Sequence, residues 1–268
     1  MPDPMTDRQP SADLTVAMIT RDAEALLPKA LESVRGLASR IVIVDTGSRD
    51  STVQLARGFE RVEVHEAGAF AGFGAAKQAA LDLCRSEWVF FLDADERVDG
   101  RLAEAIREVV GAAQQAHDGW RVRRRNHVLG RPMNSMGLDR DRPLRLFRRE
   151  SGRVSDSLVH EAVLVDGSVG QLDGQLDHHT MQSLDDYLRK IDLYTTLELE
   201  QRPRPLRVWH LAFVGPMTFV KWYFLRGGWR DGVQGLVWAG LTATSRFVRD
   251  MKGWVGDSSA GRDTVNKA

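Results

Sequence analysis

The sequence contains almost no cysteine and carries no formal net charge. Its single cysteine, Cys84, excludes an internal disulfide bond and fits a reducing compartment. The amino terminus has acidic residues and prolines before any apolar run, which is not the pattern of a secretory signal. We therefore expect a cytoplasmic location.

Long apolar runs are also missing. The most aromatic region, residues 208–254, is interrupted by Lys221, Arg226 and Arg230, so we expect no segment that spans a bilayer. The chain has 268 residues, of which 43% are hydrophobic and 28% are charged, and this composition excludes a wholly disordered protein. The length is sufficient for one large α/β domain with an appendage.

The zero net charge hides a strongly basic segment. Residues 120–153 contain eleven arginines against three acidic residues. Such a segment indicates a solvated face, or a site for nucleic acid, anionic lipid or a phosphorylated substrate. Within it, Arg142 and Arg145 are candidates for bidentate contact with a donor diphosphate or a phosphorylated acceptor.

The first hundred residues alternate between strand and helix patterns. Strands are predicted at 14–19, 41–44, 62–64 and 88–92, and helices at 22–35, 52–57 and 74–84. Repeated β-α-β units predict a mostly parallel, doubly wound α/β sheet. The carboxyl ends of three of these strands should bring residues 20–22, Asp45 and residues 93–95 to one edge.

The strand at 88–92 ends in two carboxylates one residue apart, Asp93 and Asp95. Open α/β sheets bind ligands at this end, and carboxylate oxygens suit Mg²⁺ or Mn²⁺ carrying a phosphorylated substrate. The alternative is a strand that simply ends in a turn, because Asp favours turns and helix starts. The surrounding sequence must decide between the two.

Three motifs, at residues 16–22, 43–52 and 90–96, resemble those of the family 2 glycosyltransferases in this order. That family has the GT-A nucleotide-diphospho-sugar transferase fold, and the resemblance covers residues 13–165. It implies that a UDP-sugar is the donor and that Asp45 hydrogen-bonds the uracil imide. It further implies that Asp93 reaches the ribose or the metal and that Asp95 binds the divalent ion at the diphosphate.

The same resemblance implies further donor contacts. Thr20 and Asp22 lie in the first motif, although Arg21-Asp22 stands where the family more often has Asn-Glu, and Gly47 lies in the second. Lys77 lies at the start of a predicted helix after a glycine-containing segment, where backbone and cation can meet a diphosphate. Gly74 in that segment is expected to be a packing residue.

Glycosyl transfer also needs a base that accepts the proton of the attacking hydroxyl, and a partly desolvated carboxylate is the usual choice. Glu161 lies just beyond the basic segment, where related transferases carry a His-Glu or Glu-Asp base. We predict Glu161 as the base and His160 as a residue that orients or contacts substrate; Asp156 and Asp139 remain alternatives. One carboxylate acting opposite the nucleotide predicts inversion at the anomeric carbon.

A pair of adjacent histidines, His178 and His179, follows in a predicted loop. By position His178 is a candidate third metal ligand or a contact to the acceptor. Adjacent histidines in a loop more often face solvent or support other residues, so this alternative stays open.

The pattern changes after residue 180. Residues 183–200 predict an amphipathic helix with a capping-box-like start, and residues 208–254 hold five of the seven tryptophans among basic residues. This fits an interfacial membrane anchor, and the alternative is a helical subdomain packed on the core. The predicted domains are a disordered amino terminus at 1–12, a GT-A domain at 13–180, a membrane-associating region at 181–255 and a disordered tail at 256–268.

Taken together, these segments most resemble bacterial lipopolysaccharide core glucosyltransferases of family 2. The resemblance implies a peripheral enzyme at the cytoplasmic face of the inner membrane that moves glucose from UDP-glucose to a heptose. Its acceptor would be phosphorylated and lipid-linked, its cofactor Mg²⁺ or Mn²⁺, and no nucleic-acid partner is expected. A polyprenyl-phosphate or other cell-envelope glycosyltransferase and a non-catalytic membrane scaffold remain as alternatives. An acid-phosphatase-like enzyme would carry the Asp-x-Asp on its first strand, whereas two motif-bearing strands precede it here.

Overall fold

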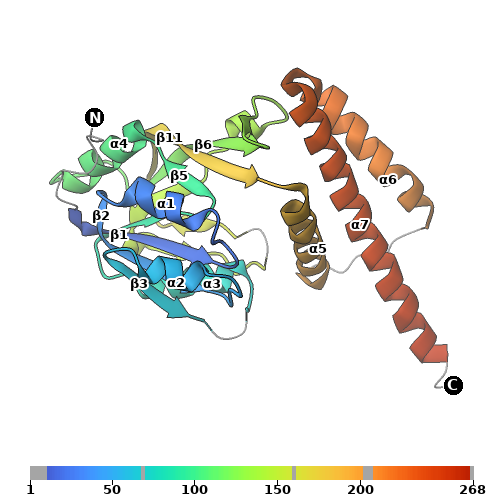
Figure 1. The fold of residues 1–268 in the computed structure, drawn as a ribbon, viewed down its shortest axis with the longest axis horizontal. Coiled ribbons are helices and arrows are strands. Elements are labelled where there is room, and N and C mark those ends of the chain that lie inside the picture. The colour runs from blue at the N-terminus through green and yellow to red at the C-terminus, as the bar shows by residue number, and fades with distance from the viewer. Residues whose placement is uncertain (1–10, 68–69, 159–160, 202–207, 266–268) are drawn as a thin grey trace. The chain divides into compact units, whose positions relative to one another are not determined.

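The computed structural model describes residues 11–67, 70–158, 161–201 and 208–265. The first ten residues, where the sequence predicted disorder, and His160 lie outside this part of the chain. The chain divides into two compact units (Figure 1). The α/β unit comprises residues 1–125 and 140–178, and the helical unit comprises residues 126–139 and 179–268. Residues 126–139, which the predicted domain 13–180 included, therefore group with the helical unit.

A nine-stranded mixed sheet is formed by the described residues, with the path β3-β2-β1-β4-β8-β6-β11-β5 and β7 paired to β6. The strands are β1 (Ser11–Thr20), β2 (Ala38–Asp45), β3 (Val62–Glu66), β4 (Trp88–Phe91), β5 (Glu96–Val98), β6 (Gly119–Val128), β7 (Arg131–Pro132), β8 (Leu144–Arg148) and β11 (Val169–Met181). The strands β1, β2, β3 and β4 pair with one another in parallel, as the sequence predicted. The strand β8 runs antiparallel to β4 and β6, and the connection from β6 to β8 contains no α-helix of the kind that returns a chain for parallel pairing.

Helices cover both faces of the parallel strands, because side chains alternate along each strand. Val16 and Ile43 face a core that contains α1 (Leu27–Val34) and α4 (Gly100–Gly111). The other face packs Ala17, Val44 and Phe91 against α3 (Phe73–Asp82). The helix α2 (Thr52–Arg57) contributes one buried alanine to the first core.

The helix predicted from residue 22 begins later, at Leu27. Asp22 has a φ of 47°, which is outside the helical region, and its backbone N–H donates to Ser48 Oγ at 2.9 Å. A helix cannot include this residue, and Pro28 supports a start near Leu27 because proline is tolerated in the first turn.

A small antiparallel pair, β9 (Gly152–Val154) and β10 (Val163–Val165), flanks the segment that carries the predicted base. Two short 3₁₀ turns lie nearby in sequence, at Leu138–Arg140 and Arg149–Ser151. Beyond the pair, Ser155 N donates to Ala162 O at 2.9 Å, which holds these two residues together on either side of the intervening segment.

The helical unit contains α5 (Leu184–Gln201), α6 (Val208–Val220), a π-helical turn (Lys221–Leu225), a 3₁₀ turn (Gly228–Asp231) and α7 (Gly232–Val265). Ser183 caps α5, accepting from Asp186 N at 3.1 Å, as the capping-box pattern predicted. The core of this unit comprises Val128, Met133, Met136, Met181, Ile191, Trp238 and Leu241. Within the described residues, no helix combines the length and apolar character needed to cross a bilayer.

The structure differs from the sequence prediction at the carboxyl-terminal end. The tail was expected to be disordered from Gly256, but the backbone of α7 is helical through Val265. No proline follows Pro216 in the sequence, so nothing in this stretch blocks continuation of the helix.

Candidate active site

The first two strands bring the predicted residues Thr20 and Asp45 directly opposite each other in the sheet. The Asp45 carboxylate is buried and accepts four hydrogen bonds. Oδ1 accepts from the backbone N–H groups of Gly47 and Ser48, at 3.0 and 2.9 Å, and Oδ2 accepts from Thr20 Oγ1 at 3.0 Å and Ser48 Oγ at 2.5 Å. These bonds use the acceptor capacity of a carboxylate, so Asp45 here shapes the turn at the end of β2.

Gly47 and Asp22 complete this turn. Gly47 has a φ of 97°, a backbone conformation that favours glycine, and no atom lies within 4 Å of the place where a Cβ would be. The exposed Asp22 accepts from Arg49 N at 2.7 Å, which ties the end of β1 to the turn after β2. The result is a fixed turn with an open face at the carboxyl ends of two parallel strands.

Asp93, at the end of β4, lies between two buried cations. Lys77 Nζ is 3.0 Å from Asp93 Oδ1, and Arg145 Nη2 donates to Asp93 Oδ2 at 2.6 Å. Burial alone would raise the pKa of Asp93, but the charges of Arg145 and Lys77 hold it well below its usual range. Asp93 is therefore an ionised carboxylate that is already paired, which favours an organising role over direct ligation of a metal.

A second layer of charge supports this arrangement, and the sequence did not identify it. Glu96 is fully buried, accepts from Asp93 N at 3.1 Å, and pairs with Arg145 and with Arg124. Arg124 also donates to Asp141 Oδ2 at 2.7 Å. Two features of the sequence could have indicated this second group of charges. Glu96 directly follows Asp95, and Asp141 lies among the arginines of residues 120–153.

Arg145 differs from its predicted role as a phosphate contact. Only 4% of the residue is exposed, and its guanidinium is bonded to Asp93 and Glu96. Burial lowers the pKa of Arg145, but these two carboxylates outweigh it and raise the pKa above its ordinary value. Arg142 is half-buried, and Arg121 Nη1 donates to its backbone carbonyl at 3.1 Å. That bond does not involve the guanidinium of Arg142, which stays a candidate for phosphate.

The predicted base Glu161 lies beside this cluster. Lys77 Nζ is 2.8 Å from Glu161 Oε1, so one ammonium group joins the candidate base to Asp93. Asp156, an alternative base, is exposed. Asp139, the other alternative, belongs to the helical unit. The structure thus connects Glu161, of the three candidates, to the carboxylates at the end of β4.

Asp95 and His178, both predicted as metal ligands, are brought together although 83 residues separate them (178 − 95). His178 Nε2 is 3.4 Å from Asp95 Oδ2, because β11 pairs with β5 directly after the Asp-x-Asp turn. No cluster of three or more His, Cys, Asp or Glu side chains fit for a metal occurs among the described residues. One carboxylate and one imidazole would suit an ion such as Mn²⁺ that takes its other ligands from a phosphorylated substrate and water.

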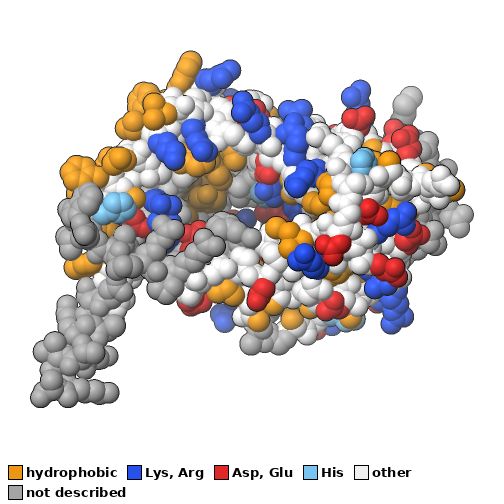
Figure 2. Space-filling model, turned by 180° about the vertical axis from the view of Figure 1, so that it is seen from behind, with side chains coloured by type: hydrophobic (Ala, Val, Ile, Leu, Met, Phe, Trp, Pro, Cys, Tyr) orange, Lys and Arg blue, Asp and Glu red, His pale blue; other side chains and the backbone are white. Residues whose placement is uncertain are grey.

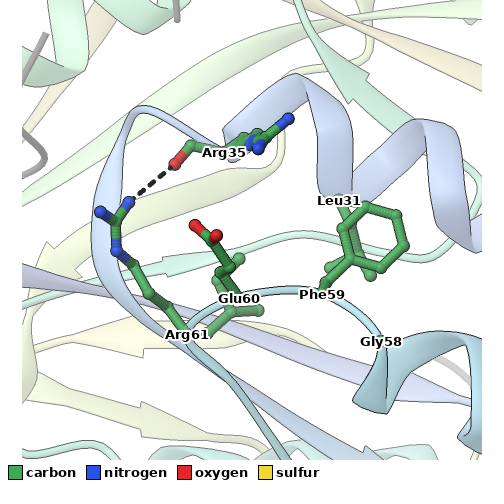
Figure 3. Close-up of a pocket in the computed structure, with 7 residues that line it drawn as sticks. Leu31, Arg35, Gly58, Phe59, Glu60 and Arg61 are labelled. Atoms are coloured by element: carbon green, nitrogen blue, oxygen red, sulfur yellow. Dashed lines mark hydrogen bonds between the residues drawn. The ribbon is translucent and has the colours of Figure 1, made fainter. Parts of the chain in front are cut away.

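A separate pocket of about 260 Å³ lies at the opposite edge of the sheet, near the amino end of β2 (Figure 3). It is lined by Leu31, Arg35, Ile41, Gly58, Phe59, Glu60 and Arg61. Arg61 Nη1 donates to the carbonyl of Arg35 at 3.4 Å across its rim. None of the predicted site residues lines this pocket, and we assign it no part in the chemistry.

Comparisons with known proteins show what the chain is similar to. The model of glycosyl transferase family 2 matches residues 15–159. The lipopolysaccharide core biosynthesis glycosyltransferase LpsC of Rhizobium meliloti (strain 1021) is 34% identical, over 97% of this chain and 98% of LpsC. An uncharacterized glycosyltransferase of Rickettsia typhi is 22% identical, over 88% of this chain and 85% of that protein. A crystal structure of S. aureus TarS covers 94% of this chain and 92% of its own, with 14% identity and a TM-score of 0.49.

The chain belongs to glycosyl transferase family 2. Its α/β unit has the GT-A-like fold that the sequence predicted, with the helical unit following it in the chain. The family match covers the turn after β2, the Asp-x-Asp at the end of β4 and the segment up to the residue that precedes His160.

Proposed function

We propose that this protein is a metal-dependent, inverting glycosyltransferase of lipopolysaccharide core assembly, with a UDP-sugar as donor. The observation that carries the proposal is the convergence at the end of β4. There, Lys77 joins the candidate base Glu161 to Asp93, and Asp95 pairs with His178. The likeness to LpsC, whose name states a role in lipopolysaccharide core biosynthesis, supports the pathway.

The donor is UDP-glucose in this proposal, as the resemblance implies. The turn held by Asp45 and Gly47, with Thr20 and Asp22 beside it, offers an open face for the uridine at the carboxyl ends of β1 and β2. Asp45 acts chiefly by holding that turn, since its carboxylate already accepts four hydrogen bonds. Its predicted bond to the uracil imide requires one of those internal bonds to be exchanged.

The reaction follows from the charges at the site. Glu161 accepts the proton of the acceptor hydroxyl, whose oxygen forms a bond to the anomeric carbon. The bond from that carbon to the diphosphate breaks, and its electron pair leaves with the diphosphate. Asp95 and His178 would hold a divalent ion, whose charge stabilises the leaving diphosphate when it is bound. Attack opposite the leaving group inverts the anomeric configuration.

The acceptor is a phosphorylated, lipid-linked heptose at the cytoplasmic face of the inner membrane, and the helical unit offers a surface suited to that location. We name it the 213–236 surface after its exposed apolar residues, Phe213, Met217, Val220, Phe224, Leu225, Trp229, Val233 and Leu236. Leu225 is 79% exposed and Val233 is 69% exposed, and Lys221, Arg226 and Arg230 are exposed among them. Apolar and basic side chains gather on the visible face of the helical unit, at the left of Figure 2.

Such a surface suits the boundary of an anionic bilayer. Exposed apolar patches of this kind mark interaction sites, and aromatic and basic side chains together favour the lipid headgroup region. Arg226 stacks over the Trp222 ring, 4.6 Å from its centroid, which keeps a cation beside an aromatic ring at the surface. The protein binds the membrane peripherally in this account.

A transfer assay tests the proposal. The purified protein is incubated with Mn²⁺, a set of radiolabelled UDP-sugars and lipopolysaccharide from a strain whose core ends at heptose. Incorporation of glucose into the lipopolysaccharide, with a β-linkage in the product, supports it. Transfer only to a polyprenyl phosphate would replace the proposed acceptor, and no transfer from any UDP-sugar to any acceptor would overturn the enzyme assignment.

A further inference from the structure

We infer that Lys77 is a positioning residue for the base: its ammonium group holds the Glu161 carboxylate against the Asp93 cluster, in place of binding the donor diphosphate. The inference rests on the proposed glycosyl transfer, in which Glu161 accepts the proton. It replaces the donor-contact role that the sequence predicted for Lys77.

The contacts of Lys77 are buried and specific. Its side chain is 8% exposed, and Nζ lies 3.0 Å from Asp93 Oδ1 and 2.8 Å from Glu161 Oε1. Burial lowers the pKa of Lys77, but the two carboxylates raise it above the ordinary value despite the nearby charge of Arg145. The group is therefore an ammonium ion at neutral pH, and two of its three N–H donors are directed at carboxylates.

Backbone hydrogen bonds connect the start of α3 to the segment that precedes the base. At the start of α3, Phe73 N donates to Leu158 O at 3.2 Å and Gly74 N donates to Ser157 O at 3.0 Å. A Cβ on Gly74 would lie 2.6 Å from Ser155 O, so only glycine lets the helix approach this closely. The helix that carries the lysine is therefore held against residues 155–158, which precede the glutamate in the chain, independently of the ion pair.

Moving Nζ out of this site to a diphosphate would break at least one of its two contacts. Glu161 would then lose this ion pair, or Asp93 would be left with its pairing to Arg145, in a site that is largely closed to water. An unpaired buried carboxylate is strongly unfavourable, and a half-exposed arginine such as Arg142 meets a diphosphate without that cost. The pairing of Lys77 with Asp93 and Glu161 is therefore more favourable than a contact with the diphosphate.

The pairing also directs the proton. Because Lys77 binds Oε1 of Glu161, the second carboxylate oxygen is the one that accepts the proton from the acceptor hydroxyl. A base held in one orientation speeds the reaction because it acts at a high effective concentration. A displacement of the base by about 1 Å can lower the rate by about 100-fold. Loss of Lys77 should therefore lower turnover while the donor still binds.

The test uses Lys77→Met, which keeps the length of the side chain and removes its charge, with the exposed Lys29→Met as a matched control. The expected result is a kcat lower by about 10- to 100-fold, with the donor KM and the calorimetric affinity for UDP changed by less than about threefold. Lys29→Met should match the wild type. A tenfold weaker UDP affinity and donor KM with kcat unchanged would overturn the inference and restore the donor contact.

Two further measurements separate positioning from a general loss of structure. In a Glu161→Gln background, Lys77→Met should lower kcat no further, whereas a role independent of Glu161 would add its own loss. If Lys77→Met does not fold, Lys77→Arg keeps the charge and should lower kcat with KM retained; the reverse pattern contradicts the inference. A wild-type protein without transferase activity would instead refute the proposed function itself.

Discussion

The two units of the molecule place their charged and apolar side chains in opposite ways. In the α/β unit, Lys77, Glu96 and Arg145 are buried among hydrophobic strands and are paired with other charged groups. In the helical unit, large apolar side chains such as Phe213 and Leu225 are exposed to solvent. Each arrangement is costly for a protein that only needs to fold.

The unfavourable burial of charge in one unit and exposure of apolar side chains in the other indicate what each unit does. Buried ion pairs lose hydration and rarely add net stability, but they fix carboxylates in set positions, as a reactive centre requires. Exposed apolar surface gains nothing in water and is typical of a surface that binds a partner. The comparison supports the proposal that the chemistry belongs to the α/β unit and attachment to the helical unit.

The largest effect is expected from Glu161→Gln. The amide cannot accept the proton, so kcat should fall by about 10²- to 10⁴-fold while UDP binding is retained. The matched control is Asp156→Asn, which removes an exposed carboxylate from the same loop. Steady-state transfer assays compare the two; if Asp156→Asn lost activity and Glu161→Gln kept it, the assignment of the base would be wrong.

The attachment role is tested on the 213–236 surface. The double variant Leu225→Glu and Trp229→Glu puts charge on two of its exposed apolar positions, so co-sedimentation with anionic vesicles should weaken by about tenfold or more. Leu55→Glu, at an exposed leucine of the α/β unit, should leave sedimentation unchanged. Equal binding by both variants, or a dimer that the double variant disrupts, would contradict the membrane role.

A smaller effect is expected where α3 meets residues 155–158. Gly74→Ala forces a methyl group against Ser155 O, so the free energy of unfolding should fall by about 1–3 kcal/mol in urea titrations. Gly100→Ala has no atom within 4 Å of the new methyl group and should be neutral or slightly stabilising. Equal stabilities of the two variants would show that the close contact is not needed.

The smallest effect concerns Cys84. Burial raises the pKa of its thiol to about 12, and Sγ lies 3.2 Å from Ala80 O. Since the thiolate is the reactive form, native protein should react with iodoacetamide at pH 8 much more slowly than urea-unfolded protein, and the rate should rise with pH. Equal rates in the two states would show that the thiol is accessible, against the packing described.

The sequence predicted the features that depend on local pattern and on strand ends. The parallel strands and their helices follow from apolar periodicity, and the turn after β2 follows from its Asp, Gly and Ser residues. The resemblance named Asp95, and His178 was a candidate by its position; the pairing of β5 with β11 explains why the two lie close together.

The remaining features depend on tertiary packing. Nothing in the sequence near Lys77 shows that its charge ends between Asp93 and Glu161, because the three residues come from a helix, a strand end and a distant loop. Alternation along β8 could not distinguish an arginine that contacts phosphate from the buried Arg145. An arginine can be buried when carboxylates from other segments pair with it. The local sequence does not show which carboxylates the fold will bring to each arginine.

Calorimetric titration with UDP, with and without Mn²⁺, tests the central claim most directly, namely that the end of β4 is a sugar-nucleotide site completed by Asp95 and His178. The account predicts binding that depends on Mn²⁺ and is lost in Asp95→Ala and in His178→Ala, while both variants keep the wild-type melting temperature. Metal-independent binding that both folded variants retain, or no binding of UDP by the wild type under any metal condition, would contradict it.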